Sequence, residues 1–340
     1  MLNFLNLEYF LVAAEELNFT KAAKRLFISQ QSLSSHIASL EKDLDVALFD
    51  RTSPLTLTYA GHVFASRART LLDLKEEAFR EMADIKDFTT GQLTIGVSHT
   101  RGRVILPEIL PAYRRLFPGI ELSLLEGNSQ ELDHALFHGD VDLIIGMKPF
   151  SVEHVQTVPI CNEDILLAVS DSLLEQYFPN RKQVMMEHLS HGVDLRMLAQ
   201  CPVLTVKKGN RVRTIMDEMY QDAQITPSII FEAENIETIL ALAAKGMGIA
   251  FYPQMFIRPS RQGLNFYPLS YGKAHGVLAI GYYKNRYLPQ AAKEFIRIAI
   301  KILQSENNTF SREDSDALLS FTSDCQEPKT AMKKLSLSDK

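Results

Sequence analysis

The chain has 340 residues, 46% hydrophobic and 23% charged, and its 36 basic and 41 acidic side chains give a net charge of −5. This balance is typical of a folded globular protein of about two domains and excludes a chain that is disordered throughout. The negative net charge counts against a protein that holds nucleic acid by bulk charge alone.

The cysteines and the apolar segments narrow the class of protein further. Cys161, Cys201 and Cys325 are far apart and odd in number, so they fit neither a disulfide framework nor a zinc site. No apolar run approaches the length needed to cross a bilayer, and no signal-peptide pattern stands near the start. We therefore expect free thiols in a reducing cytoplasm and no membrane partner.

Two helices joined by a tight turn are predicted between Asn18 and Arg51, behind a supporting helix over residues 7–17. Thr20 is expected to cap the first of the two, because its hydroxyl can accept a hydrogen bond from an amide two or three residues later. Ser29 is expected to cap the second helix in the same way. Apolar residues at steps of four, three and four form a stripe on that helix: Leu33, Ile37, Leu40 and Leu44.

The opposite face of the second helix is uncharged. It carries Gln30, Gln31, Ser34, Ser35 and Ala38. A solvated helix would more often carry Lys and Glu there, whereas these side chains suit insertion between base edges in a DNA major groove. The pattern favours a DNA-reading helix-turn-helix over a helical hairpin with a purely structural role.

A two-stranded wing is predicted over residues 48–58, where Pro54 excludes a helix. Arg51 at the base of this wing is a candidate for a phosphate contact, and an ion pair with Asp50 or Glu41 is the alternative. The complete set of predicted DNA-binding residues is Thr20, Ser29, Gln30, Gln31, Ser34, Ser35, His36, Arg51 and Thr58.

A long helix is expected over residues 59–89. Apolar residues recur along it at four-three spacing, with Lys75 at the one missing step: Phe64, Ala68, Leu71, Ala78, Met82 and Ile85. A seam of this period indicates pairing with another helix, and packing against its own domain is the alternative. Because about 30 residues span ~45 Å, more than the N-terminal domain can cover, we predict a dimerisation helix that doubles as a linker.

Strands and helices alternate from residue 91 onward, which predicts βαβ units and a parallel sheet. Ligands of such sheets bind beyond the carboxyl ends of the strands, at helix N-termini. Basic residues near these ends (His99, Arg101, Arg103, Lys148, Lys207 and Lys208) favour an anionic metabolite, and a solvated rim is the alternative. The predicted effector-binding residues are Ser98, His99, Thr100, Arg101, Asn128, Ser129, Lys148, Thr205 and Phe251.

Patterns of catalysis are absent from the sequence. His134 and His138 lie four residues apart beside Asp133, but no HExxH pattern and no third ligand accompany them. Neither a GxxxxGK[ST] motif nor a GxGxxG motif after a strand occurs. We predict no catalytic residue, no metal and no cofactor.

The chain resembles the LysR-type transcriptional regulators from Leu2 to about Leu303. The resemblance rests on NFTKAAKRLFISQQSLSSHIASLEKDL, on LFDRT followed by LTLTYAG, and on the α/β domain that comes next. It implies an α+β multidomain fold: a winged helix-turn-helix over 1–58, a linker helix over 59–89 and a two-lobed, periplasmic-binding-protein-like effector domain over 91–303. Lobe I would comprise 91–160 and 266–303, lobe II would comprise 161–265, and the effector would bind between them.

Several segments depart from the family pattern. Family members often carry proline where Gln31 stands and arginine where Ser35 stands, and the wing SPLTLT has no basic residue. The stretch 173–200 is longer than usual and is expected to cover the cleft or to add a helix. The polar tail over 304–340 extends past the family fold and is predicted to be mostly disordered.

The sequence therefore predicts a cytoplasmic, sequence-specific transcription regulator that responds to a small, anionic metabolite. Its expected partners are double-stranded DNA with a two-fold-symmetric site, the effector, and further copies of itself as a homodimer or homotetramer. RNA polymerase is a further candidate partner. The alternatives are a solute-binding module whose N-terminal helices serve only dimerisation, and an enzyme on the same two-lobed fold.

Overall fold

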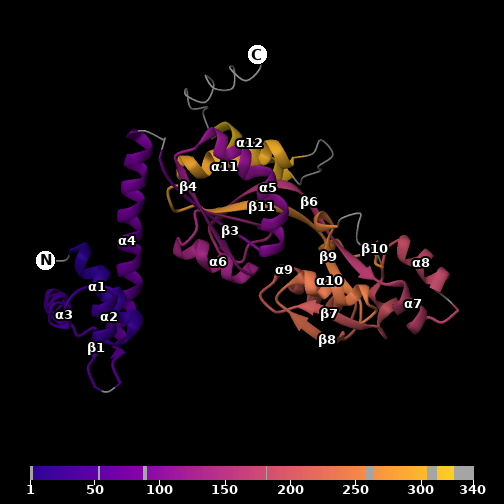
Figure 1. The fold of residues 1–340 in the computed structure, drawn as a ribbon, viewed down its shortest axis with the longest axis horizontal. Helices are drawn as coiled ribbons and strands as arrows, with labels where there is room; N and C mark the ends of the chain where they lie inside the picture. The colour runs from indigo at the N-terminus through magenta and orange to yellow at the C-terminus, as the bar shows by residue number, and fades with distance from the viewer. Residues whose placement is uncertain are drawn as a thin grey trace, which may run out of the picture. The chain divides into compact units, whose positions relative to one another are not determined.

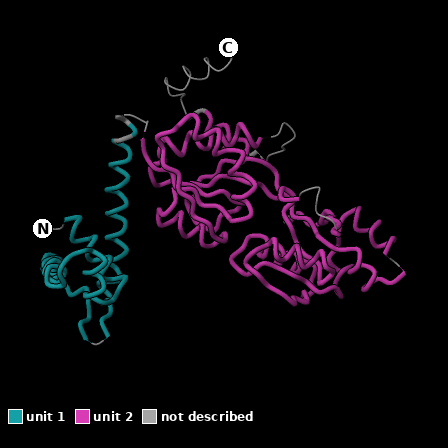
Figure 2. Tube along the Cα trace, viewed as in Figure 1, with its two compact units in different colours: residues 1–86 teal, residues 87–340 magenta. Residues whose placement is uncertain are grey.

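The computed structural model describes residues 3–52, 54–86, 90–180, 182–257, 263–304 and 312–324. The chain divides into two compact units, residues 1–86 and residues 87–340 (Figure 2). Within the described residues, no helix is both long enough and apolar enough to cross a membrane.

The N-terminal unit is a helical domain with a two-stranded wing (Figure 1). Its elements are α1 (Phe4–Glu16), α2 (Phe19–Arg25), α3 (Gln30–Leu44), β1 (Phe49–Asp50), β2 (Thr56–Leu57) and α4 (Tyr59–Lys86). The wing strands are antiparallel, with Phe49 opposite Leu57. The predicted stripe of α3 lies in the domain core, where Leu33, Ile37 and Leu40 are buried.

The helix caps follow the residue preferences with one correction. Ser29 caps α3 as predicted, since its Oγ accepts the amide of Ser32 at 3.1 Å. The cap of α2 is Asn18, whose Oδ1 accepts the amides of Thr20 and Lys21 at 3.0 Å each. The expectation that Thr20 caps this helix is therefore wrong: Thr20 lies inside the first turn, and Asn is the stronger capping residue.

Helix α4 packs on its own domain along its first part and leaves apolar side chains exposed along the rest. Phe64 and Ala68 pack against the core of the N-terminal unit, and Phe64 meets Phe10 with ring centroids 5.1 Å apart. Further along, Lys75 pairs with Glu8 of α1 at 2.9 Å. Apolar side chains on the rest of the helix are exposed in this unit: Val63, Leu71, Leu74, Phe79 and Met82. The seam is thus shared between packing on its own domain and a free face; the side chain of Ile85 and residues 87–89 lie outside the described parts.

In the second unit, lobe I is built on five strands in the order β6-β11-β5-β3-β4. The bounds are β3 (Gly91–Val97), β4 (Ile120–Glu126), β5 (Leu143–Met147), β6 (Val155–Val169) and β11 (His275–Tyr283). Strands β3, β4 and β5 are parallel, as predicted, and β11 runs antiparallel to both β5 and β6. Helices α5 (His99–Leu116) and α11 (Gln290–Leu303) share one core with the sheet, and α6 (Ser129–His138) belongs to a second one.

Lobe II is joined to lobe I by a continuous strand, because the second half of β6 pairs with β9 (Ala250–Pro253) and β10 (Asn265–Pro268). Beside them β7 (Pro202–Val206) and β8 (Ser228–Ala233) form a parallel pair. The helices are α7 (Asp171–Tyr177), α8 (Lys182–Ser190), α9 (Arg211–Asp222) and α10 (Ile236–Ala244), with short 3-10 turns η1 (Leu195–Leu198), η2 (Gln254–Phe256) and η3 (Gly272–Ala274).

One predicted limit of the lobes is wrong, and the stretch 173–200 adds a helix to lobe II, which was one of its two expected roles. Residues 266–268 were expected in lobe I, but they pair with residues 166–168 of β6 in lobe II, so the chain returns to lobe I only with β11. The long stretch 173–200 adds helix α8 and η1, and Leu189, Leu195 and Leu198 lie buried in the core of lobe II.

The C-terminal tail also needs a correction, because part of it is an ordered helix. Helix α12 (Arg312–Asp324) buries Phe321 in the core of lobe I, where its ring lies 6.3 Å from that of Tyr282. The sequence of this segment is polar on average, but three of its residues face the core of lobe I: Asp314, Leu318 and Phe321. Residues 305–311 and 325–340 lie outside the described residues.

Candidate nucleic-acid interface and ligand cleft

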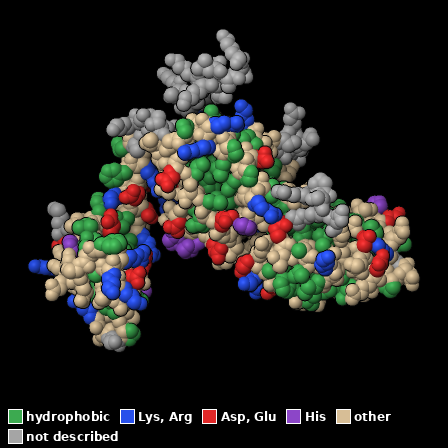
Figure 3. Space-filling view, in the orientation of Figure 1, with side chains coloured by type: hydrophobic (Ala, Val, Ile, Leu, Met, Phe, Trp, Pro, Cys, Tyr) green, Lys and Arg blue, Asp and Glu red, His purple; other side chains and the backbone are tan. Residues whose placement is uncertain are grey.

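The candidate nucleic-acid interface is the outer face of α3. The cap at Ser29 fixes where the helix begins, and the buried stripe fixes which side faces outward. Side chains of the predicted reading face are exposed at Gln30, Gln31, Ser35 and Ala38 and half-buried at Ser34. Lys and Arg side chains are visible on the N-terminal unit in Figure 3. A neutral hydrogen-bonding helix face on a domain with basic surroundings can contact both base edges and phosphates.

The predicted phosphate contacts all have partners within the domain. His36 Nδ1 lies 2.8 Å from Asn6 Oδ1, and its ring packs edge-on against Tyr9. The Thr58 hydroxyl donates to the carbonyl of Ala47 at 2.7 Å and accepts the amide of Gly61 at 3.0 Å.

Arg51 forms an ion pair with Glu41, one of the two ion pairs expected as the alternative to a phosphate contact. Arg51 Nη2 lies 2.9 Å from Glu41 Oε2, whereas Asp50 accepts hydrogen bonds from Thr52 instead. The guanidinium has five N–H donors, and the Arg51 side chain remains 55% exposed, so most of its donors still face solvent.

Sequence reasoning missed Asn6, a residue that helps to orient the candidate interface. This asparagine is buried on α1 and holds His36 of α3. The available signal was an amide among the apolar positions of the first helix, because buried polar groups need hydrogen-bond partners.

The candidate ligand cleft lies where the first turns of α5 and α6 face lobe II. Asn128 caps α6 in a capping box with Glu131, so the first turn of this helix is firmly defined. Across the cleft, the Gln130 amide donates to the Gly209 carbonyl at 3.0 Å and the Arg211 amide donates to Ser129 Oγ at 3.1 Å. The predicted residue Ser129 therefore meets lobe II at the N-terminus of α9, whereas the side chain of Asn128 caps α6.

A buried ion pair lies at the base of this region. Arg101 Nη2 is 2.8 Å from Glu163 Oε2 on β6, and the guanidinium stacks over the ring of Phe256 in lobe II. Arg101 Nε and Glu163 Oε1 are buried without a hydrogen-bond partner among the described residues. A further contact between the lobes joins Arg103 to Glu237 at 3.1 Å.

Among the residues that the structure describes, each basic residue that indicated an anionic ligand, except Lys208, has an acidic partner. Besides the arginines, His99 Nδ1 lies 3.1 Å from Glu126, and Lys207 lies 3.1 Å from Glu234. Lys148 pairs with Asp314 of α12 at 2.6 Å. These basic side chains are therefore largely compensated by acidic partners, which sequence spacing could not show because the partners are 27 or more residues away.

The remaining predicted effector residues have different surroundings. Ser98 is the N-cap position of α5 but makes no side-chain cap bond, and Thr100, two residues later, is buried. Thr205 is buried and donates to the carbonyl of Val206 at 3.3 Å. Phe251 lies in the core of lobe II, with its ring 6.1 Å from that of Tyr220, so the structure does not bring it together with the other candidates.

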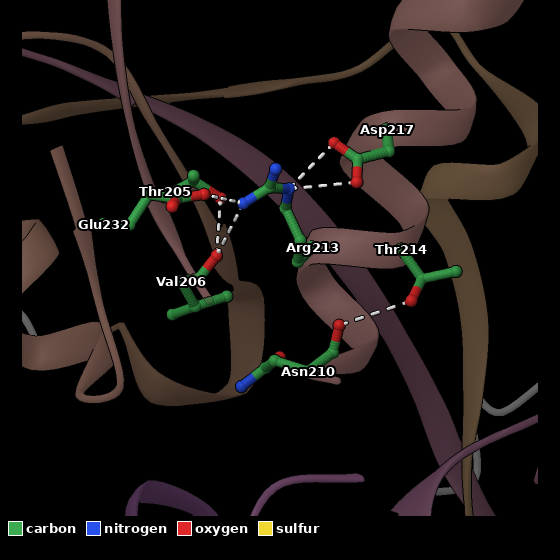
Figure 4. Close-up of polar contacts among 7 residues, drawn as sticks. All are labelled: Thr205, Val206, Asn210, Arg213, Thr214, Asp217 and Glu232. Atoms are coloured by element: carbon green, nitrogen blue, oxygen red, sulfur yellow. Dashed lines mark hydrogen bonds and ion pairs between the residues drawn. The ribbon is translucent and has the colours of Figure 1, made fainter. Parts of the chain in front are cut away.

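Arg213, which sequence reasoning missed, fastens α9 to the sheet of lobe II (Figure 4). Its Nε donates to both oxygens of Asp217 at 2.8 and 2.9 Å, and its Nη1 contacts the Val206 carbonyl and the Glu232 carboxylate. Burial by itself lowers the pKa of Arg213, but the hydrogen bonds to Glu232 and Asp217 outweigh it and raise the pKa. The first turn of α9, which faces Ser129, is thereby held in place; the i,i+4 spacing of Arg213 and Asp217 was the available signal.

Metal and catalytic chemistry gain no support from the described residues. No group of three or more His, Cys, Asp or Glu side chains within them is arranged to hold a metal ion. His134 and His138 stack with ring centroids 3.9 Å apart, and His138 Nδ1 contacts the His134 carbonyl at 2.9 Å. This pair is a feature of an exposed helix face.

Comparison with known families covers nearly the whole chain. Residues 4–62 match the model described as bacterial regulatory helix-turn-helix protein, lysR family. Residues 86–303 match the model described as LysR substrate binding domain. Helix α12 begins beyond the second match.

Individual relatives are similar to the chain over most of its length. The uncharacterised HTH-type transcriptional regulator YcgK of Bacillus subtilis is 27% identical over 305 residues, 88% of this chain and 94% of its own. The DNA-binding transcriptional dual regulator OxyR of Escherichia coli is 32% identical over 263 residues, 77% of this chain and 82% of its own.

Solved structures agree in fold. Full-length CbnR complexed with its target DNA has a TM-score of 0.58 at 24% identity and covers 88% of this chain and 100% of its own. A full-length OxyR from Pseudomonas aeruginosa has a TM-score of 0.64 at 22% identity and covers 92% and 99%.

Proposed function

The chain belongs to the LysR family of transcriptional regulators, and on this premise we propose that it recognises a two-fold-symmetric DNA site in response to a small effector. The helix-turn-helix domain binds DNA, and the two-lobed domain is an effector-binding domain. The observation that carries the finer proposal is the outward face of α3, where Gln30, Gln31 and Ser35 are exposed beside a defined helix start. Such side chains can read base edges in the major groove.

We propose that this chain works as a homodimer or homotetramer through α4. The exposed apolar side chains of that helix include Leu71, Leu74 and Met82, which a monomer would leave in water. Paired helices would place two copies of α3 on the two halves of a symmetric site. At a bound promoter the oligomer would act together with RNA polymerase, in the cytoplasm.

For the effector we propose a small metabolite with an anionic group, bound between the lobes and without any metal or other cofactor. Two features support an anion: the N-terminal end of α5, with its positive dipole, and Arg101 Nε, a buried donor that lacks an acceptor among the described residues. The compensation of most basic side chains of this region by acidic partners indicates a compound with few negative charges. A thermal-shift screen of small carboxylates, each with its neutral amide as control, tests this; stabilisation by amides alone would contradict it.

Hydrogen peroxide is a different candidate for the effector, because one relative is named hydrogen peroxide-inducible genes activator. A peroxide response that acts on thiols needs a reactive thiolate. Burial raises the pKa values of both Cys161 and Cys201 to about 11, so both stay protonated at neutral pH. We therefore do not propose peroxide sensing through either residue.

Selection of bound sequences from a random DNA pool at near-physiological salt tests the proposal. We expect enrichment of a two-fold-symmetric site. No enrichment by a folded and oligomeric sample would contradict sequence-specific binding and favour a solute-binding module. Turnover of a cleft ligand would favour an enzyme, for which the family gives no support.

A further inference from the structure

Helix α12 supplies a buried carboxylate to the effector domain from beyond residue 303, where the family match ends. Asp314 is 6% exposed, and its Oδ1 lies 2.6 Å from Lys148 Nζ, whose side chain is 22% exposed. Replacing Asp314 by a neutral residue would deprive the half-buried Lys148 ammonium of this carboxylate, which is costly for a charge with reduced access to water.

The rest of α12 is fixed to lobe I by apolar contacts. Phe321 is buried in the core that contains Phe295 of α11, and Leu318 packs against the same core. The helix also contacts β6, the strand that continues from lobe I into lobe II. Figure 1 shows α12 beside α11 on lobe I. One end of the helix is therefore fixed by apolar packing and the other by the ion pair.

Lys148 lies next to the crossing between the lobes. Its amide donates to the Val277 carbonyl at 2.9 Å, and Val277 is paired with Asn162 of β6. The next pair along these strands, Gly276 with Glu163, includes the partner of Arg101. The Asp314–Lys148 ion pair thus lies beside the point at which β6 leaves lobe I and β11 returns to it.

We propose that α12 is an intramolecular clamp: its docking through Asp314 and Lys148 restrains the lobes, and its release lets the cleft open. Release also frees the Lys148 ammonium for an anionic ligand, so effector binding and α12 docking oppose each other. Because coupling is reciprocal, any ligand that takes Lys148 loosens α12 to the same extent. This regulation rests on the proposed effector function of the cleft.

Hydrogen exchange of the full chain, followed by mass spectrometry of peptides, tests the clamp without a known effector. The exchange rate is compared in three regions. Residues 312–324 show whether α12 is docked, peptides with Gln130 and Arg211 show whether the contacts between the lobes are intact, and β3 is the internal reference. For Asp314→Asn and Lys148→Gln we expect about tenfold faster exchange in α12, several-fold faster exchange at the cleft and no change in β3. Asp316→Asn removes the same charge from an exposed position of the same helix and is expected to match the unchanged chain.

Several outcomes would overturn the clamp. Unchanged exchange in α12 would show that the ion pair does not hold the helix. Faster exchange in α12 with unchanged cleft peptides would make it a surface helix without influence on the lobes. If β3 also exchanges faster, the charge-swapped double variant Lys148→Asp/Asp314→Lys decides: recovered protection supports the clamp, and continued loss contradicts it. DNA selection with the same variants is read separately, so a failure of site recognition counts against the proposed function alone.

Discussion

The carboxylate of Glu41 joins α3 to the wing through both of its oxygens. Oε2 lies 2.9 Å from Arg51 Nη2, and Oε1 accepts the amides of Leu48 at 2.8 Å and Phe49 at 3.2 Å. Because the Glu41 side chain is only 15% exposed, it is the hydrogen-bond acceptor for these two backbone amides in a site with little access to water. The position of Arg51 relative to the recognition helix is set by this one side chain.

Glu41→Ala should lower the free energy of unfolding of the N-terminal domain by about 1–3 kcal/mol, because two amides lose their acceptor. Arg51→Gln should cost about 0–1 kcal/mol, as is usual for an exposed ion pair. Urea titration followed by circular dichroism measures both, with Glu41→Gln as a control that keeps an acceptor oxygen. Equal losses for Glu41→Ala and Arg51→Gln would show that the amide contacts contribute nothing.

Replacing both Gln30 and Ser34 by Ala should relax sequence discrimination, because each good base contact contributes about 1–3 kcal/mol against a wrong base. The measurement is the ratio of the dissociation constants for the selected site and a scrambled site. Ser39→Ala, an exposed position further along the same helix, serves as the control. An unchanged ratio in the double variant would remove both residues as base readers.

Arg51→Gln should weaken binding to all sequences to the same extent. Loss of one phosphate contact lowers the slope of log affinity against log salt by about one. Titrations of selected and scrambled sites at several salt concentrations give this slope. A changed preference between sites, with an unchanged slope, would instead make Arg51 a base reader.

The exposed face of α4 makes a prediction about assembly. Leu74→Glu combined with Met82→Glu should dissociate the oligomer, because charges on a helix–helix seam would be buried without partners. Sedimentation velocity measures the change, and Ser66→Glu, exposed on another side of the helix, is the control. If the double variant keeps its oligomeric state, subunits must associate through another surface.

The two described cysteines predict a pH dependence. Burial raises the pKa values of Cys161 and Cys201 to about 11, above the ordinary thiol value of 9.0. A thiol whose pKa is higher in the folded than in the unfolded state contributes stability at pH values below the unfolded pKa. This contribution to the free energy of unfolding is lost as the pH rises from about 9 to about 11.

The same surroundings predict slow chemical labelling of these thiols. In a Cys325→Ser background, thiol labelling at pH 8 should be slow until denaturant is added. Cys201 is buried and Cys161 is half-buried, so rapid labelling of Cys201 in the native chain would contradict this prediction.

How far the sequence predicts this molecule depends on the range of each interaction. The stripe of Leu33, Ile37 and Leu40 is buried as expected, and Ser29 begins α3, because periodicity and capping act over three or four residues. The cap of α2 was equally local; the stronger capping preference of Asn18 over Thr20 identifies it. Alternating strands and helices likewise predicted the parallel part of the lobe I sheet.

The sequence by itself determined the order of the elements, the family and the outward face of α3, because these follow from residue types at short spacing. Only the tertiary structure decided which charges meet. Arg101 is paired with Glu163, 62 residues away, and Lys148 with Asp314, 166 residues away, in a tail whose average composition predicted disorder. A charge pair depends on where the chain returns in space, and α12 contacts lobe I through Asp314, Leu318 and Phe321 although its sequence is polar on average.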